Sequence, residues 1–233
     1  MGAQHRNRRG WACGVVLVAL LGAACARSAE AWLADLDHPD PFVRALAALA
    51  LSEQGGEHAA AALPVLLETV DRTELGLEPQ ASAALAHIAP RVAEGLIESL
   101  LTDEFMTSER RVAVLRALEQ SGESGAYAIV AALRGSARKQ AGDLGVLLVR
   151  IGPAAVPALI ELVSDGSQPR LQGYAAFVLG QLGAGARTAG AALQALSDHP
   201  DPAVRAVIVE ALQRIESAGA GLPGPADASE RGR

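Results

Sequence analysis

The chain is poor in aromatic residues and in cysteine, and both shortages narrow what it can be. Aromatic side chains make up only 3% of the 233 residues, whereas half of all residues are apolar, so alanine and larger aliphatic residues must form the core. The two cysteines, Cys13 and Cys25, both lie among the first 26 residues. Without that segment the chain has no disulfide, no thiolate metal site and no cysteine nucleophile. This composition favours an array of closely packed helices over a globule with aromatic anchors.

Lysine is nearly absent, and the chain is acidic. Its formal net charge is −6, and removing the first 26 residues with their three arginines leaves 17 basic against 26 acidic residues, about −9. An acidic chain repels phosphate backbones. The only basic cluster has a single aromatic neighbour, Tyr127, and comprises Arg110, Arg111, Arg116, Arg134, Arg138 and Lys139. We therefore expect no nucleic-acid partner.

The motifs of common catalytic sites are absent from the sequence. It contains no G-x-S-x-G elbow, no Walker loop, no H-E-x-x-H helix and no G-x-G-x-x-G turn after a strand. The histidines outside the first 26 residues have no second His or Cys at metal-binding spacing; they are His38, His58, His87 and His199. We predict a protein that is not an enzyme and that needs neither a metal nor another cofactor.

The first 26 residues have the order of a secretory leader. Three arginines precede an apolar run over residues 11–24, and small residues follow. The run has 14 residues, whereas a membrane span needs about 20. We therefore predict export to the cell envelope.

The end of this leader offers two processing routes. The sequence Leu21-Gly22-Ala23-Ala24-Cys25 resembles a bacterial lipobox, which implies that Cys25 is lipidated and anchors the protein in the outer membrane. Cleavage after Ala26 by an ordinary signal peptidase is the alternative and would release a periplasmic protein. Apart from this possible anchor at Cys25, we predict no membrane contact.

An internal repeat of about 33 residues dominates the rest of the chain. Six leucines close similar patterns of small and aliphatic residues at intervals of 34, 33, 30, 31 and 33 residues: Leu51, Leu85, Leu118, Leu148, Leu179 and Leu212. Stacked helix pairs have this period. Since one pair cannot bury its apolar face alone, neighbours must stack. We predict an all-α, right-handed solenoid of about six helix pairs.

The same turn opens the first and the last unit. Asp37-His38-Pro39-Asp40-Pro41 recurs as Asp198-His199-Pro200-Asp201-Pro202, and Val-Arg follows each copy. Proline presets the start of the next helix, and Asp40 or Asp201 can cap its free amides. The histidines are expected to stabilise these turns.

The arginine after each turn defines a signature position in every unit. Arg44, Arg111 and Arg205 occupy it, whereas Glu78, Ala141 and Gln172 replace arginine in the other units. Counted from this position, residues 3, 6 and 7 are apolar in all six units, which is one face of a helix. These inner helices alternate with partner helices predicted at 29–36, 58–70, 91–101, 125–133, 154–163 and 186–196.

The Asp-Pro turn with Val-Arg, and the exit Leu179-Gly180-Gln181-Leu182-Gly183, resemble HEAT repeats, in particular the short bacterial type of phycobilisome lyases. The resemblance covers 29–215 and implies stacked helix pairs. It also implies that Arg44 pairs with Asp37 or Asp40, and Arg205 with Asp198 or Asp201.

These patterns predict three segments: the leader at 1–26, the repeats at 27–216, and a disordered tail at 217–233, rich in Gly, Ala, Pro and Ser. The expected function is a scaffold or adaptor that binds an unidentified protein. Residues 1, 2, 5 and 8 after the signature position are expected to line its concave face, with Gln80, Glu119, Asp143, Tyr174 and Glu210 as candidates. The alternatives are a bilin-lyase-like enzyme or enzyme subunit, and a lipid-tethered structural spacer.

Overall fold

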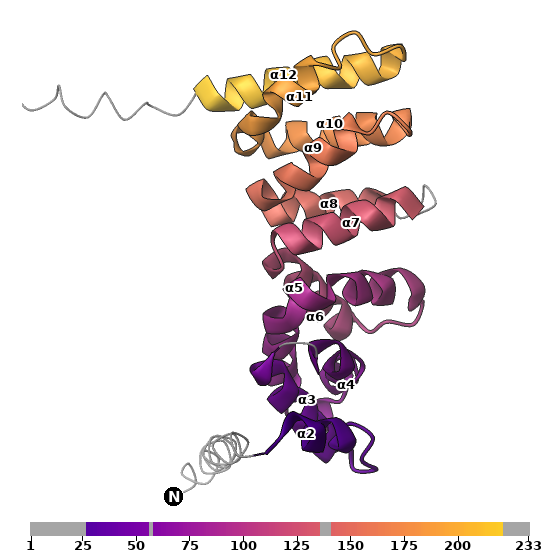
Figure 1. The fold of residues 1–233 in the computed structure, drawn as a ribbon, viewed down its shortest axis with the longest axis vertical. Coiled ribbons are helices and arrows are strands. Elements are labelled where there is room, and N and C mark those ends of the chain that lie inside the picture. The colour runs from indigo at the N-terminus through magenta and orange to yellow at the C-terminus, as the bar shows by residue number, and fades with distance from the viewer. Residues whose placement is uncertain (1–26, 56–57, 136–140, 221–233) are drawn as a thin grey trace, which may run out of the picture. The chain divides into compact units, whose positions relative to one another are not determined.

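The structure is a computed structural model, and it describes residues 27–55, 58–135 and 141–220. The described part of the chain is helical and has no strand. It divides into two compact units. The first covers the described residues through Val92 together with Thr107–Ala113, and the second covers Ala93–Met106 and the described residues from Val114 onward. Each unit is built from helices that pair and stack (Figure 1). The predicted all-α fold is confirmed.

The first unit contains α2 (Ala29–Asp35), α3 (Pro41–Gln54), α4 (Ala59–Asp71) and the short 3-10 helix η2 (Thr73–Leu75). The helix α3 packs against both α2 and α4. Two helices, α5 (Glu78–Thr102) and α6 (Ser108–Gln120), contribute residues to both units.

The second unit continues with α7 (Glu123–Gly135), α8 (Ala141–Ile151), η3 (Gly152–Ala155) and α9 (Val156–Ser164). It ends with α10 (Pro169–Leu182), η4 (Gly183–Ala189), α11 (Gly190–Gln194) and α12 (Pro202–Ala220). The helix α9 packs against α7 and α10, and α12 packs against α10. Hence α8, α10 and α12 take the predicted inner places, and α7, α9 and α11 take the outer ones.

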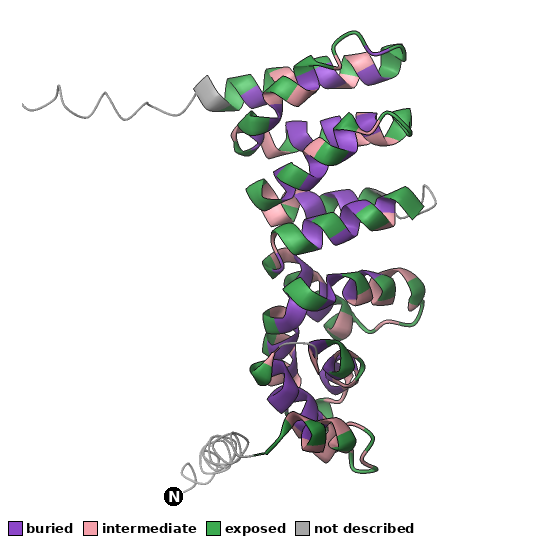
Figure 2. Cartoon of the chain, in the orientation of Figure 1, coloured by how far each residue is buried: buried purple, intermediate pink, exposed green. Residues whose placement is uncertain are grey.

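The core consists of the aliphatic side chains that the repeat predicted. Five of the six repeat leucines are fully buried: Leu51, Leu85, Leu118, Leu148 and Leu179. Leu212 in α12 is half-buried, because the described residues place no further layer beyond that helix. Buried residues gather on the sides of the helices that face their neighbours within each unit (Figure 2).

One predicted helix boundary is confirmed and two differ from the prediction. The sequence predicts a break near Arg91, and the two helical parts of α5 meet at a kink there, where Val92 leaves helical geometry (φ −119°, ψ 17°) just after Pro90. The last outer helix is predicted over 186–196, yet 3-10 geometry occupies 183–189, because glycine disfavours a regular helix in this segment.

The second difference concerns the predicted tail. Helix α12 continues to Ala220, beyond the expected end at Glu216. The extra turn has a packing partner, since a Cβ added at Gly183 would lie 3.2 Å from Cβ of Ala218. Residues 221–233 of the tail and the leader 1–26 lie outside the described residues.

One helical stretch, Gly142–Ser164, is long and apolar enough to cross a membrane by length and composition alone. Core helices of soluble proteins pass the same test. Here Leu144, Leu148 and Leu159 are fully buried inside the second unit, and Gly152 turns the chain with a φ of 77° between α8 and η3.

Candidate functional site

The two repeated turns fold alike at their helix starts. The carboxylate of Asp40 accepts a hydrogen bond from the amide of Phe42 at 2.9 Å, and that of Asp201 accepts one from Ala203 at 2.8 Å. Each caps the first turn of its helix, as predicted. The histidines also act in the turns as expected, because Nδ1 of His38 and of His199 accepts the amide of Asp40 or Asp201.

His199 makes a second bond that the sequence did not predict. Its ring is buried, with 7% of the residue exposed, and Nε2 lies 3.1 Å from Oε1 of Gln172 in α10. The amide nitrogen of Gln172 donates to the carbonyl of Val163 at 2.9 Å. Because Nδ1 accepts a hydrogen bond, the neutral ring carries its proton on Nε2, which donates a hydrogen bond to Oε1 of Gln172. This chain of bonds ties the last turn to α9 and α10.

The predicted ion pairs within the turns are wrong. Nη1 of Arg44 donates to the carbonyls of His38 and Pro39, at 2.9 and 3.3 Å, and Nη2 pairs with Glu68 of α4 at 2.7 Å. Asp37 takes no part in this network, and Asp40 serves as the helix cap. The carboxylates that cap helix starts therefore do not pair with the arginine.

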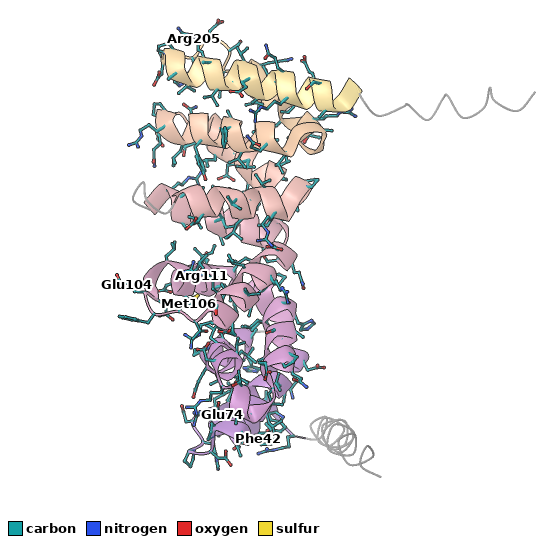
Figure 3. The ribbon with its side chains drawn as sticks, turned by 180° about the vertical axis from the view of Figure 1, so that it is seen from behind. Phe42, Glu74, Glu104, Met106, Arg111 and Arg205 are labelled. Atoms are coloured by element: carbon teal, nitrogen blue, oxygen red, sulfur yellow. The ribbon has the colours of Figure 1, made fainter. Side chains whose placement is uncertain are left out.

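Arg205 repeats part of this arrangement at the start of α12 (Figure 3). Its Nη1 donates to the carbonyls of His199 and Pro200, and within the described residues it forms no ion pair with Asp198 or Asp201. Asp201 is again occupied as a cap. Both turn arginines therefore bind backbone carbonyls of their own turns rather than the carboxylates of those turns.

The third signature arginine, Arg111, has no such role. Arg111 is exposed (Figure 3). Among the described residues, its neighbour Arg110 is the one that pairs with Asp71. The same carboxylate accepts the hydroxyl of Thr107, whose oxygen also receives the amide of Arg110. The start of α6 is thus fixed by Thr107 and Arg110, because the repeat that contains α6 lacks the Asp-Pro turn.

The candidate binding residues fall into two groups. Asp143 and Glu210 are exposed, as expected for a binding face, although Glu210 pairs with Arg214 at 2.6 Å. Gln80 and Glu119 are half-buried, and Glu119 pairs with Arg150 of α8 at 2.7 Å. The second group therefore includes a residue that links neighbouring layers.

Tyr174 is an interlayer contact rather than a free surface residue. A Cβ added at Gly145 would lie 1.9 Å from its hydroxyl oxygen, so only glycine in α8 leaves room for this ring from α10. Burial raises the pKa of the Tyr174 hydroxyl, a backbone hydrogen bond with Gly145 opposes this, and the carboxylate of Asp143 adds to the rise. Tyr174 is half-buried, and its hydroxyl end contributes to the packing of α10 on α8.

Two exposed apolar side chains of the inner helices stand at the same repeat position in adjacent layers. Val146 in α8 and Phe177 in α10 both lie five residues after the signature position, with 59% and 48% of each residue exposed. The equivalent residues of the flanking layers are Arg116 in α6 and Glu210 in α12, both exposed. These four residues form what we call the +5 row.

The layers that carry the +5 row are in direct contact. Arg150 of α8 pairs with Glu119 of α6, and Tyr174 of α10 packs on Gly145 of α8. Gly180 of α10 lies close to α12, since a Cβ added at Gly180 would be 3.0 Å from Cα of Ala211. The sequence pattern marks this position as exposed but does not single out Val146 and Phe177. Apolar residues on a repeat helix suggest core, so only the register of exposed positions could have revealed them.

The residues that stand eight positions after the signature position are not exposed in every repeat. Gly180, eight residues after its signature position, is buried against α12. Val209 of α12 is 48% exposed, but it stands four residues after its signature position, where Gly145 and Ala176 are buried. The exposed surface at position 8 is therefore narrower than predicted, whereas all four residues of the +5 row are exposed.

The described residues contain no group of three or more His, Cys, Asp or Glu that could hold a metal ion. Several carboxylates already have structural partners. Burial favours the neutral form of Glu68, but the hydrogen bonds and charges of Arg44 and Arg72 outweigh it and keep the pKa of this carboxyl below its usual value. The lipidation candidate Cys25 lies outside the described residues.

Comparison with known proteins supports the repeat assignment. Residues 152–223 match the family model of HEAT repeats. The comparison with curated proteins finds no significant match.

Two solved structures are similar to this chain. Human deoxyhypusine hydroxylase in complex with glycerol is 20% identical and has a TM-score of 0.38, over 86% of this chain and 88% of the other. A crystal structure of an engineered protein is 21% identical, with a TM-score of 0.32, over 82% of this chain and 98% of the other. The helix pairs and the match to the family model together identify an all-α fold of the solenoid type, with HEAT repeats at residues 152–223.

Proposed function

We propose that this chain is an exported, non-catalytic HEAT-repeat protein that binds another protein through the +5 row of its second unit. The observation that supports this is the exposure of Val146 and Phe177, two apolar side chains at the same position of adjacent layers. Covering such side chains removes apolar area from water, and aromatic residues are prominent among the residues that dominate protein interfaces. Scaffold and adaptor roles follow from such a surface.

The surroundings of the row fit a protein partner. Asp143 and Arg150 flank Val146 at three residues before and four residues after it on α8, and Gln181 follows Phe177 by four residues on α10. All three are exposed. An apolar centre with a polar rim is the usual anatomy of a protein interface.

Export is part of the proposal and is supported by the order of the leader. Lipidation at Cys25 would hold the repeats at a membrane, and cleavage after Ala26 would free them in the periplasm. Mass spectrometry of the mature N-terminus distinguishes the two outcomes, and an uncleaved Met1 would contradict export through a removed leader.

The binding role is tested by comparing two exposed aromatic residues of the second unit. Phe177→Asp places a charge in the +5 row, and Tyr127→Asp places one on the outer helix α7, where Tyr127 is 39% exposed. The tagged full chain is captured from cells that also make an untagged copy of it, and the co-purifying proteins, that untagged copy included, are quantified. We expect at least one protein to be lost with Phe177→Asp and retained with Tyr127→Asp. Identical protein sets from the wild type and both variants would contradict the proposal.

A further inference from the structure

We infer that the partner seated on the +5 row is a second copy of this chain, related to the first by a two-fold axis. The inference rests on the proposed function and names its partner. It comes from the order of side chains in the row, which reads Arg116, Val146, Phe177, Glu210 from α6 to α12. A cation stands at one end, an anion at the other, and two apolar groups lie between them.

This order is complementary to its own reverse. A two-fold axis parallel to the inner helices, passing between α8 and α10, turns the row end for end against itself. Arg116 then faces Glu210 of the second copy, and Val146 faces Phe177 of the second copy. An isologous interface repeats each such pair twice, so two ion pairs would flank one apolar centre.

At the two positions nearest the row on the same helix face, the described residues create no like-charge contact under the same axis. Two residues after the signature position, Asp143 would face the half-buried Tyr174 of the second copy. Nine residues after it, Arg150 would face Gln181, and Gln120 would face Arg214. Opposed like charges cost interface stability and specify against a partner, so their absence from these pairs favours this arrangement.

The end charges are available for such pairing. Arg116 is exposed and forms no ion pair among the described residues. Glu210 meets Arg214 through Oε1, one turn further along α12. Exposed pairs of this kind stabilise a helix only slightly, and they leave the second carboxylate oxygen open to a further donor.

Oligomeric state tests this inference with two charge reversals. The mature full chain is studied by sedimentation velocity from about 1 to 100 μM, the range in which weak specific dimers form. We expect the wild type to dimerise. Arg116→Glu puts two pairs of glutamates in contact and Glu210→Arg two pairs of arginines, so each variant alone should dimerise at least about tenfold more weakly.

Mixing the two variants is the decisive step. In a mixed dimer the glutamate introduced at position 116 of one chain faces the arginine introduced at position 210 of the other, and the unchanged Arg116 and Glu210 face each other in the second pair. We therefore expect the mixture to form dimers as the wild type does. Phe177→Asp should abolish the dimer and Tyr127→Asp should leave it intact, with circular dichroism confirming that each variant is helical.

Several outcomes would overturn the inference. These are a wild type that stays monomeric over the whole range, single reversals that leave dimerisation unchanged, and a mixture that associates no better than its components. A monomeric wild type whose capture of another protein is lost with Phe177→Asp would overturn the second copy as partner and leave the proposed binding function standing. A dimer insensitive to Phe177→Asp would overturn the +5 row as the contact between two copies, and the capture experiment would then decide whether the row binds another protein.

Discussion

The first and last turns of the repeat region share five letters, Asp-His-Pro-Asp-Pro, yet they differ in what surrounds them. In the first unit His38 is half-buried and its ring makes one hydrogen bond, to the amide of Asp40. In the second unit His199 is buried and its ring also reaches Gln172. The local sequence therefore determines the cap and the turn, and the neighbouring layer determines how strongly the turn is held.

The largest expected difference between the two turns is at the histidines. His199→Ala should lower the free energy of unfolding of the second unit by about 1–3 kcal/mol, because it leaves Oε1 of Gln172 buried without a donor. His38→Ala should cost less than about 1 kcal/mol, because its single bond is exposed to water.

Hydrogen exchange of α12 and α3 measures the two effects separately, because each helix follows one of the turns. The wild type and a His199→Gln variant serve as references. Equal losses for His38→Ala and His199→Ala would show that the bond to Gln172 adds nothing to stability.

The helix caps should not distinguish the two turns. Asp40→Ala and Asp201→Ala each remove one acceptor from a helix start with the same geometry, so both should cost about 1 kcal/mol. Urea unfolding of each variant, with Asp40→Asn and Asp201→Asn as conservative controls, measures the cost. A loss confined to one end would mean that the common turn is not the stabilising unit.

A small difference between the two turns is expected at the arginines, and it depends on pH. Both arginines bind carbonyls of their turns, but only Arg44 also pairs with a carboxylate among the described residues, Glu68. Arg44→Gln should therefore cost at most about 1 kcal/mol more than Arg205→Gln, since the pair is partly exposed.

The sign of the pH dependence follows from Glu68. Its folded pKa lies below the ordinary value, so the stabilisation is present above about pH 4.3 and is lost as pH falls through the lowered folded pKa. The extra cost of Arg44→Gln should shrink over the same interval. Thermal unfolding from about pH 6 to pH 3 follows both variants. A cost of Arg44→Gln that stays constant to the lowest pH would rule out the contribution of this pair.

The sequence is informative wherever the fold depends on local pattern. The period of the leucines, the capping residues Asp40 and Asp201, and the partner helices α2, α4 and α7 follow from rules that act within one or two turns. The break near Arg91 also follows from local pattern, since the kink lies at Val92 just after Pro90. The end of α12 does not, because packing of Ala218 on Gly183 prolongs the helix beyond Glu216.

The candidate site is harder to predict because it depends on contacts between repeats. Gln172 interrupts the arginine series in the sequence, but it is the buried partner of His199, 27 residues away. The resemblance to HEAT repeats implies a carboxylate partner of Arg44 within its own turn, yet the partner is Glu68 from the next helix. The register of Tyr174 predicts contact with a partner protein, whereas its hydroxyl fills the space above Gly145. Sequence spacing alone does not reveal such interlayer contacts.

The most direct test of the account is site-specific photo-crosslinking in the cells that make the protein. A photoreactive amino acid is placed at Phe177 in the +5 row or at Tyr127 on α7, two aromatic positions of similar exposure. The account predicts a defined protein adduct, either a second copy or another protein, from position 177 and little or none from position 127. Adducts of equal yield from both positions, or no protein adduct from position 177, would contradict it.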